Sequence, residues 1–130
     1  EPLVQLLRTG DSMGKTQAAG AIWNLAGNAN NKIAIARAGA VEPLVQLLAT
    51  GDAAGKTKAS GALGNLAGNA DNKKVIALAG AVEPLVQLLR TGNALGKTQA
   101  ARALSNLACN NADNQIAIAR AGAVEPLVEL

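Results

Sequence analysis

The 130-residue sequence contains no His, no Phe and no Tyr, and it has only one Cys and one Trp. His is the most common general base and metal ligand in proteins, so its absence removes much of the chemistry that enzymes and metal sites use. A single Cys cannot form an internal disulfide. From these absences we expect a non-enzymatic protein with no cofactor and no metal site.

Charged residues make up only 16% of the sequence, with a formal net charge of +3 and a pI near 9.4. The apolar fraction of 49% is enough to build a core, which argues against a disordered segment. No apolar run approaches the roughly 18 residues that a membrane span needs. Aromatic side chains that could stack on bases are almost absent. We therefore expect an intracellular protein that binds neither nucleic acid nor a membrane.

One segment recurs along the whole chain. EPLVQLL begins at Glu1, Glu42 and Glu83, and EPLVEL begins at Glu125, so the period is 41 residues twice and then 42. We divide the chain into units 1–41, 42–82 and 83–124 and a partial unit 125–130, without dedicated capping repeats. A period of about 40 to 47 residues is typical of HEAT and armadillo repeats, which are built from helices.

Each unit contains a short segment that we interpret as a helix. In the middle unit it covers residues 72–79, with Asp71 as the N-cap and Gly80 at the C-terminal end. In the first unit, residues 33–36 alternate in a way that also fits a strand. The equivalent residues 74–78 break that alternation, and Ala is uncommon in strands.

A second and a third helix follow in each unit. The second begins at Glu42 and Pro43, because Pro is tolerated in the first turn, and it ends at Thr50. The third is the longest, begins after the N-cap Asp52 and runs to about Gly68. Three helices per unit indicate an all-α solenoid of the armadillo type, whereas two would indicate HEAT repeats.

A helical wheel of the third helix in the first unit separates two faces at about 100° per residue. We expect the apolar face to lie in the core; it carries Ala18, Ala21, Ile22 and Leu25. The opposite face is a polar stripe with one triplet from each unit: Gln17, Gly20 and Asn24; Lys58, Gly61 and Asn65; Gln99, Arg102 and Asn106. Trp23 flanks the stripe, either as an anchor for a partner or as a packing residue.

The order of a short helix, a GAV-EPLVQLL helix and a long helix that ends in Asn-Leu-Ala resembles armadillo repeats over the whole chain. The segment around Cys109 is particularly similar to β-catenin repeats. The resemblance implies a right-handed superhelix whose third helices line a concave groove. It also implies that Asn24, Asn65 and Asn106, the first residues of the Asn-Leu-Ala segments, hydrogen-bond the backbone of an extended peptide.

The sequence departs from importin-α-like armadillo repeats at two positions of each unit. The positions that hold Trp in those relatives hold Gly20, Gly61 and Arg102 here, and the acidic positions hold Gln17, Lys58 and Gln99. The carboxylates and aromatic side chains that suit a basic peptide are therefore missing. By charge complementarity we expect a protein or peptide partner that is neutral or acidic rather than basic.

Other interpretations of the same residues stay open. Asn side chains can also tie neighbouring helices together, because buried amides need partners. The repeats can serve as a structural spacer, either within a longer armadillo protein or by head-to-tail association. Gly14-Lys15-Thr16 suggests a phosphate-binding loop and a nucleotide hydrolase. That loop needs GxxxxGK[ST], however, and the segment from Gly10 reads GxxxGKT, one residue too short.

Overall fold

The structure is a computed structural model that describes residues 2–129, and this part of the chain is all-helical. The first helices follow in the order α1 (Pro2–Thr9), α2 (Ser12–Leu25), α3 (Ala29–Arg37), α4 (Val41–Thr50) and α5 (Ala53–Leu66). They are followed by α6 (Ala70–Leu78), α7 (Val82–Thr91), α8 (Ala94–Ala108), α9 (Ala112–Arg120) and α10 (Val124–Glu129). Each 41-residue period thus contains three helices, which excludes the two-helix HEAT alternative.

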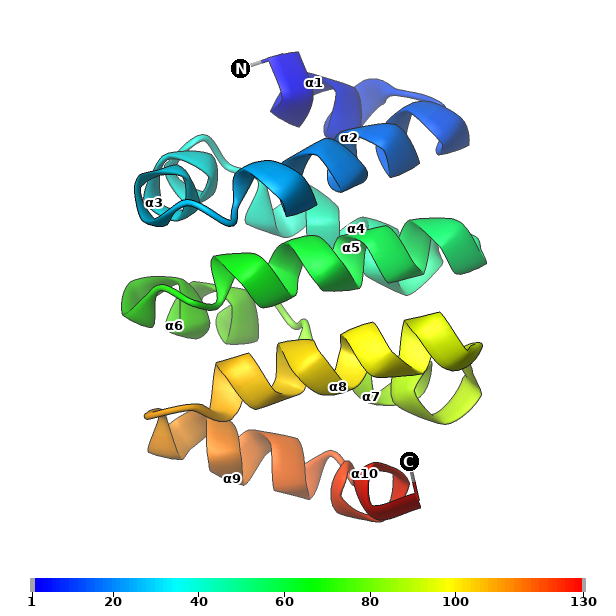
Figure 1. The fold of residues 1–130 in the computed structure, drawn as a ribbon, viewed down its shortest axis with the longest axis vertical. Helices are drawn as coiled ribbons and strands as arrows, with labels where there is room; N and C mark the ends of the chain where they lie inside the picture. The colour runs from blue at the N-terminus through cyan, green and yellow to red at the C-terminus, as the bar shows by residue number, and fades with distance from the viewer. Residues whose placement is uncertain (1, 130) are drawn as a thin grey trace.

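The helices stack in layers along the long axis of the molecule (Figure 1). The third helices of the units, α2, α5 and α8, lie side by side, and the second helices, α4 and α7, lie behind them. The central helix α5 packs against α2, α4 and α8. The two termini lie at opposite ends of the stack.

Within residues 2–129, no single helix is long and apolar enough to cross a membrane. Together, α3 and α4 reach the required length and composition, but they are bent by 85° at the break between them.

The helix boundaries follow from side-chain caps. Asp52 accepts a hydrogen bond from the Gly55 backbone N–H at 2.9 Å, as expected for the N-cap of the third helix, which ends at Leu66, two residues earlier than predicted. The N-cap predicted for the short helix was wrong. Asn69 rather than Asp71 caps α6, because the Asn69 carboxamide accepts from the Asn72 backbone N–H at 3.1 Å. Asp71 lies in the first turn, where a carboxylate favours the helix dipole.

The predicted core of the third helix is correct in the middle of the stack and wrong at one position of the first unit. Ala18 and Ile22 are buried, Ala21 is half-buried, and Leu25 is 45% exposed. Its equivalents Leu66 and Leu107 are fully buried. Helices α5 and α8, which carry those two leucines, each contact the short helix of the preceding unit, α3 or α6, whereas within residues 2–129 no short helix precedes α2. Burial at this position therefore comes from the neighbouring unit.

Two buried side-chain amides join the short helices of successive units. Asn72 Nδ2 donates to the carbonyls of Lys32 and Leu66 at 3.1 and 3.0 Å. Asn114 Nδ2 makes the same pair of bonds in the next unit, to Lys73 and Leu107, at 3.2 and 2.9 Å. Each amide therefore satisfies one carbonyl of its own unit and one of the preceding unit. Removing either side chain would break one hydrogen-bonded link between successive units.

We predict that Leu66→Ala lowers the free energy of unfolding by about 2 to 5 kcal/mol, since it opens a cavity between two units. The matched variant Leu25→Ala changes the same residue type at the exposed equivalent and should cost about 1 kcal/mol or less. Urea titration of dilute protein, followed by circular dichroism, measures both values. Equal losses would show that Leu66 does not depend on the neighbouring unit for its burial.

Candidate functional site

The predicted stripe residues lie on one face of the molecule, which we call the third-helix face. Its residues are Gln17, Gly20, Trp23 and Asn24 of α2, Lys58, Gly61 and Asn65 of α5, and Gln99, Arg102 and Asn106 of α8. The three helices pack side by side, so the structure brings the three triplets together as expected. On this face, the contacts over Gly20, Gly61 and Gly64 pair residues 38 positions apart, three fewer than the repeat period of 41.

At the first junction, the indole of Trp23 covers Gly61. A Cβ atom at position 61 would lie 2.8 Å from the indole Cε3 and closer still to Cδ2 and Cε2. The Lys58 ammonium lies 5.6 Å from the indole centroid, within range of a cation–π interaction. The aliphatic part of Lys58 in turn lies over Gly20, with its Cδ 3.6 Å from the position that a Cβ would occupy. Trp23 is half-buried, so it packs between units and keeps an exposed edge.

At the second junction, the larger side chain comes from the later unit. Arg102 of α8 reaches back over Gly64 of α5, with Nη1 3.1 Å from the position of a Cβ there. Its Nη2 donates a hydrogen bond to Asn65 Oδ1. Arg102 itself is exposed. Sequence analysis missed Gly64 because it stands where the first unit has Trp23, outside the stripe; comparing residues 38 positions apart would have found it.

The three stripe asparagines do not have equivalent surroundings. Asn65 Nδ2 donates to the Trp23 carbonyl at 2.7 Å, and Asn106 Nδ2 donates to the Gly64 carbonyl at 2.8 Å. Both amides therefore link their helix to the third helix of the preceding unit, which is the alternative role considered for these asparagines from the sequence. Asn24 is exposed, and its side-chain carboxamide has no hydrogen-bond partner within residues 2–129. Binding of a peptide by these residues stays a prediction.

The glutamines of the stripe differ as well. Gln17 is exposed on α2, whereas Gln99 is half-buried and its Oε1 has no hydrogen-bond partner in the described part of the chain. A buried acceptor without a partner is uncommon and costs free energy unless a donor reaches it. Gln99 thus offers an acceptor at the same junction as Arg102.

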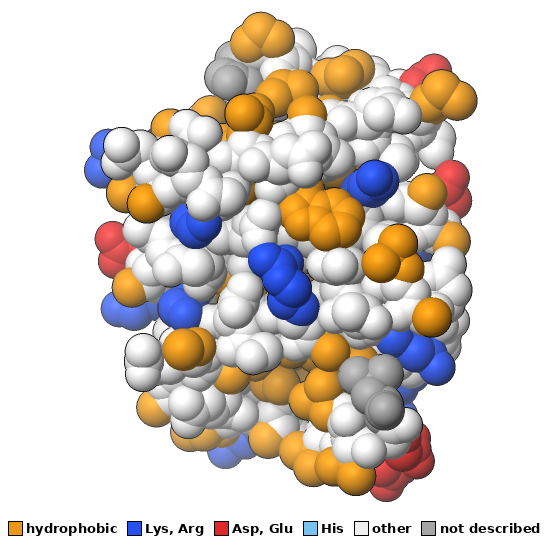
Figure 2. All heavy atoms as spheres, viewed as in Figure 1, with side chains coloured by type: hydrophobic (Ala, Val, Ile, Leu, Met, Phe, Trp, Pro, Cys, Tyr) orange, Lys and Arg blue, Asp and Glu red, His pale blue; other side chains and the backbone are white. Residues whose placement is uncertain are grey.

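The charge of the third-helix face is of one sign. Helices α2, α5 and α8 contain no Asp or Glu, and the charged residues of the third-helix face are Lys58 and Arg102. In Figure 2, Lys and Arg side chains lie over the middle of this face and Asp and Glu side chains lie toward its edges. The net charge of this face is therefore positive.

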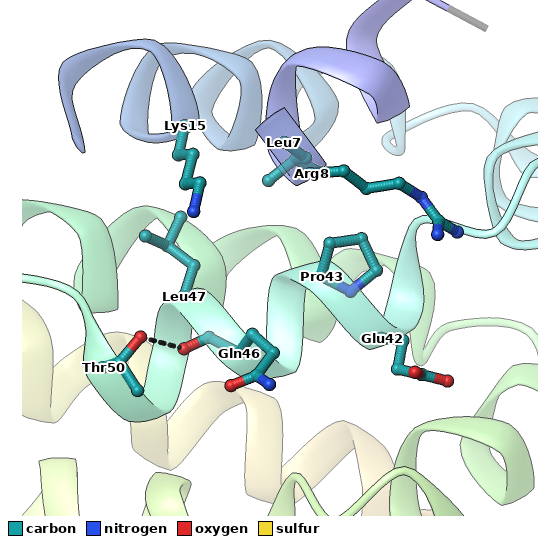
Figure 3. A pocket seen from close by; sticks show the side chains of 8 residues that line it. All are labelled: Leu7, Arg8, Lys15, Glu42, Pro43, Gln46, Leu47 and Thr50. Carbon is teal, nitrogen blue, oxygen red and sulfur yellow. Dashed lines mark hydrogen bonds between the residues drawn. The ribbon is translucent and has the colours of Figure 1, made fainter. Parts of the chain in front are cut away.

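One cavity lies outside the third-helix face. It has a volume of about 360 Å³ between α1, α2 and α4, and Arg8, Lys15 and Glu42 line it together with polar and apolar side chains (Figure 3). The Gly14-Lys15-Thr16 segment is in the first turn of α2, where Asp11 accepts from the Gly14 N–H at 2.8 Å. A carboxylate thus already occupies the helix terminus that a bound phosphate would need.

Comparison with protein families supports the assignment made from the repeats. The model of the armadillo/β-catenin-like repeat matches residues 1–27, 28–68 and 69–109. The two complete matches begin just before the short helices α3 and α6, whereas the units defined from the sequence begin at the second helix. A search of curated proteins gives no significant match.

Solved structures that align with this chain include engineered proteins and designed armadillo repeat proteins. Computationally designed armadillo repeat proteins for modular peptide recognition align with a TM-score of 0.91 and 34% identity over 99% of this chain and 55% of theirs. An engineered protein from a structural genomics consortium aligns with a TM-score of 0.91 and 40% identity over 98% of this chain and 54% of its own. A designed armadillo repeat protein in complex with the peptide (KR)4 has the same TM-score and 34% identity over 99% of this chain and 55% of its own.

The chain therefore spans about half the length of these relatives. The matches confirm the fold class expected from the sequence, a right-handed α-solenoid of tandem three-helix armadillo repeats.

We predict that Gly61→Ala displaces Trp23 and lowers the free energy of unfolding by about 1 to 3 kcal/mol, because a methyl group there overlaps the indole. Trp23 is the only Trp in the chain, so its fluorescence emission should shift to longer wavelength as the indole is pushed into water. The control Gly20→Ala has ordinary contact distances and should stabilise the helix by up to about 1 kcal/mol. An unchanged emission spectrum in Gly61→Ala would contradict the packing of Trp23 on Gly61.

Proposed function

Because the chain belongs to the armadillo repeat family, we propose that it is a non-enzymatic scaffold that binds an extended peptide segment along the third-helix face. The observation that carries the proposal is the alignment of three polar triplets across α2, α5 and α8. Solved relatives of the same fold include proteins designed for modular peptide recognition, which supports a peptide as the ligand class.

In this proposal the stripe asparagines bind the peptide backbone. A carboxamide both donates and accepts, so it can pair with the N–H and C=O groups that an extended peptide presents. Asn24 has its whole carboxamide available, and Asn106 keeps its Oδ1 and one N–H. Gln17 and Gln99 add polar groups beside them, and Gly20 lies on the same face beneath the stem of Lys58. Trp23 contributes its exposed edge as a contact for an apolar side chain.

The charge of the face selects the peptide. A designed relative is known in complex with (KR)4, a basic peptide. Here the charged residues of the third-helix face are Lys58 and Arg102 and none of its residues is a carboxylate, so a basic segment would meet like charges. Lys58 and Arg102 instead suit Asp or Glu side chains of the ligand. We therefore propose that the partner segment is neutral or acidic.

We predict that the triple variant Asn24→Ala, Asn65→Ala, Asn106→Ala loses binding of acidic and neutral extended peptides by at least about tenfold, because three backbone contacts disappear. Fluorescence anisotropy of labelled, end-blocked peptides in acidic, neutral and basic series measures the affinities. The wild-type chain should prefer the acidic series.

The control variant Gln46→Ala, Gln87→Ala removes two exposed polar side chains from α4 and α7, outside the third-helix face. It should bind as the wild-type chain does, and circular dichroism establishes that both variants are folded. A triple variant that is folded and binds normally would rule out the asparagine contacts.

A second candidate function is head-to-tail association into a rod, and the exposure of Leu25 favours it. This residue is 45% exposed, although the same position is fully buried in both later units, and the Asn24 amide beside it lacks the partner that Asn65 and Asn106 have. At the other end, Val124 and Val128 are 60% and 81% exposed. Both ends thus present half of the interface that joins units inside the chain.

We predict that concentrated protein associates and that Leu25→Glu abolishes the association, because a carboxylate would be buried at the joint. Val75→Glu is the matched control, since Val75 is similarly exposed at 48% but lies in the middle unit. Sedimentation equilibrium over a wide range of protein concentration measures the mass. A mass that stays monomeric at every concentration, or equal effects of the two variants, would exclude the rod.

A further inference from the structure

Asn65 is the only stripe asparagine in the described chain whose carboxamide is occupied at both ends. Its Nδ2 donates to the Trp23 carbonyl at 2.7 Å, and its Oδ1 accepts from Arg102 Nη2. Asn106 has its Nδ2 bonded to Gly64 but keeps its Oδ1 available, and Asn24 has neither end engaged. A peptide that runs across the face therefore meets two asparagines with a free carboxamide oxygen, Asn24 and Asn106. It meets one, Asn65, whose carboxamide is closed because Arg102 is bonded to its oxygen.

Arg102 is the exchangeable partner of this closed amide. The Trp23 carbonyl belongs to the backbone of a packed helix, whereas Arg102 is an exposed side chain on a flexible stem. Within residues 2–129 it has no carboxylate partner, since its hydrogen bond to Asn65 is to a neutral oxygen. A guanidinium binds a carboxylate, which can accept two parallel hydrogen bonds, more strongly than it binds a carboxamide oxygen.

We propose that Arg102 couples recognition of an acidic side chain to opening of the central asparagine. A ligand carboxylate draws the guanidinium away from Asn65, and the released Oδ1 then accepts a backbone N–H of the same peptide. One acidic residue in the ligand thus supplies both a charge contact and a backbone contact. A neutral segment must displace Arg102 without compensation. The inference rests on the proposed peptide-binding function and names its specificity-determining residue.

The second cation of the face does not have this effect. Lys58 lies over the indole of Trp23 and the backbone of Gly20, and it blocks no carboxamide of the stripe. Removing Lys58 takes away a positive charge and its contacts with Trp23 and Gly20, but it frees no carboxamide. Removing Arg102 takes away a positive charge and also frees Asn65. The two variants therefore separate simple charge attraction from the coupling.

The experiment compares two end-blocked peptides that differ only in Glu against Gln at one position, in a series that scans that position along the peptide. Arg102→Ala should weaken the best Glu peptide and strengthen the Gln peptide, each by about three- to tenfold. Lys58→Ala should weaken the Glu peptide without strengthening the Gln peptide, because it releases no carboxamide. In the Asn65→Ala background, Arg102→Ala should no longer strengthen the Gln peptide, because there is no amide to release.

An Arg102→Ala variant that weakens the Glu peptide without strengthening the Gln peptide would overturn the coupling and reduce Arg102 to an attractive charge. The free protein provides an independent measurement, the NMR shift of the Asn65 side-chain carbonyl carbon. Arg102→Ala should change this shift and Lys58→Ala should not. A shift insensitive to Arg102 overturns the inference even when peptides bind. A sensitive shift together with no peptide binding in any series counts against the proposed function instead.

Discussion

Every part of this structure depends on the burial of one unit against the next. A three-helix unit of about 41 residues exposes apolar side chains that it cannot cover by itself, so it is stable only in a stack. The exposed fraction of one repeated leucine shows this dependence: Leu25 of the first unit is 45% exposed, whereas its equivalents Leu66 and Leu107 are fully buried. Polar bonds between units, such as those of Asn72 and Asn114, hold the register of that stack without providing the main driving force.

The same stacking decides what the third-helix face can offer to a ligand. Side chains at a junction compete for contacts with the neighbouring helix, and the outcome differs between the two junctions. At the first junction the Lys58 ammonium lies over the Trp23 indole, and at the second Arg102 donates a hydrogen bond to Asn65. Groups that look equivalent in the repeat pattern therefore differ in how readily they meet a partner, and Asn24 is the most accessible of the three asparagines.

The regular features of the fold follow from the sequence because they repeat. The 41-residue period, the Asp52 cap and the Asn-Leu-Ala segments each appear in several units, so a local error in one unit is corrected by the others. The wrong N-cap at Asp71 came from reading one unit alone, where Asn69 and Asp71 are both good caps and only the bond to Asn72 distinguishes them. Leu25 was placed in the core because a helical wheel shows which side is apolar but not whether a neighbour covers it. The Arg102 contact with Asn65 joins residues 37 positions apart, and no pattern within a helix contains it.

The packing at the two junctions also restricts which whole units the chain can lose or duplicate, as happens when a gene recombines between near-identical repeats. The bulky residue comes from the earlier unit at the first junction, as Trp23 over Gly61, and from the later unit at the second, as Arg102 over Gly64. Loss of the middle unit would bring Trp23 against Arg102, with two large side chains in the space of one. Duplication of the middle unit would bring Gly64 against Gly61 and leave that space empty. The order of the units is thus fixed by which side chains fit together at each junction, although the sequences of the units are very similar.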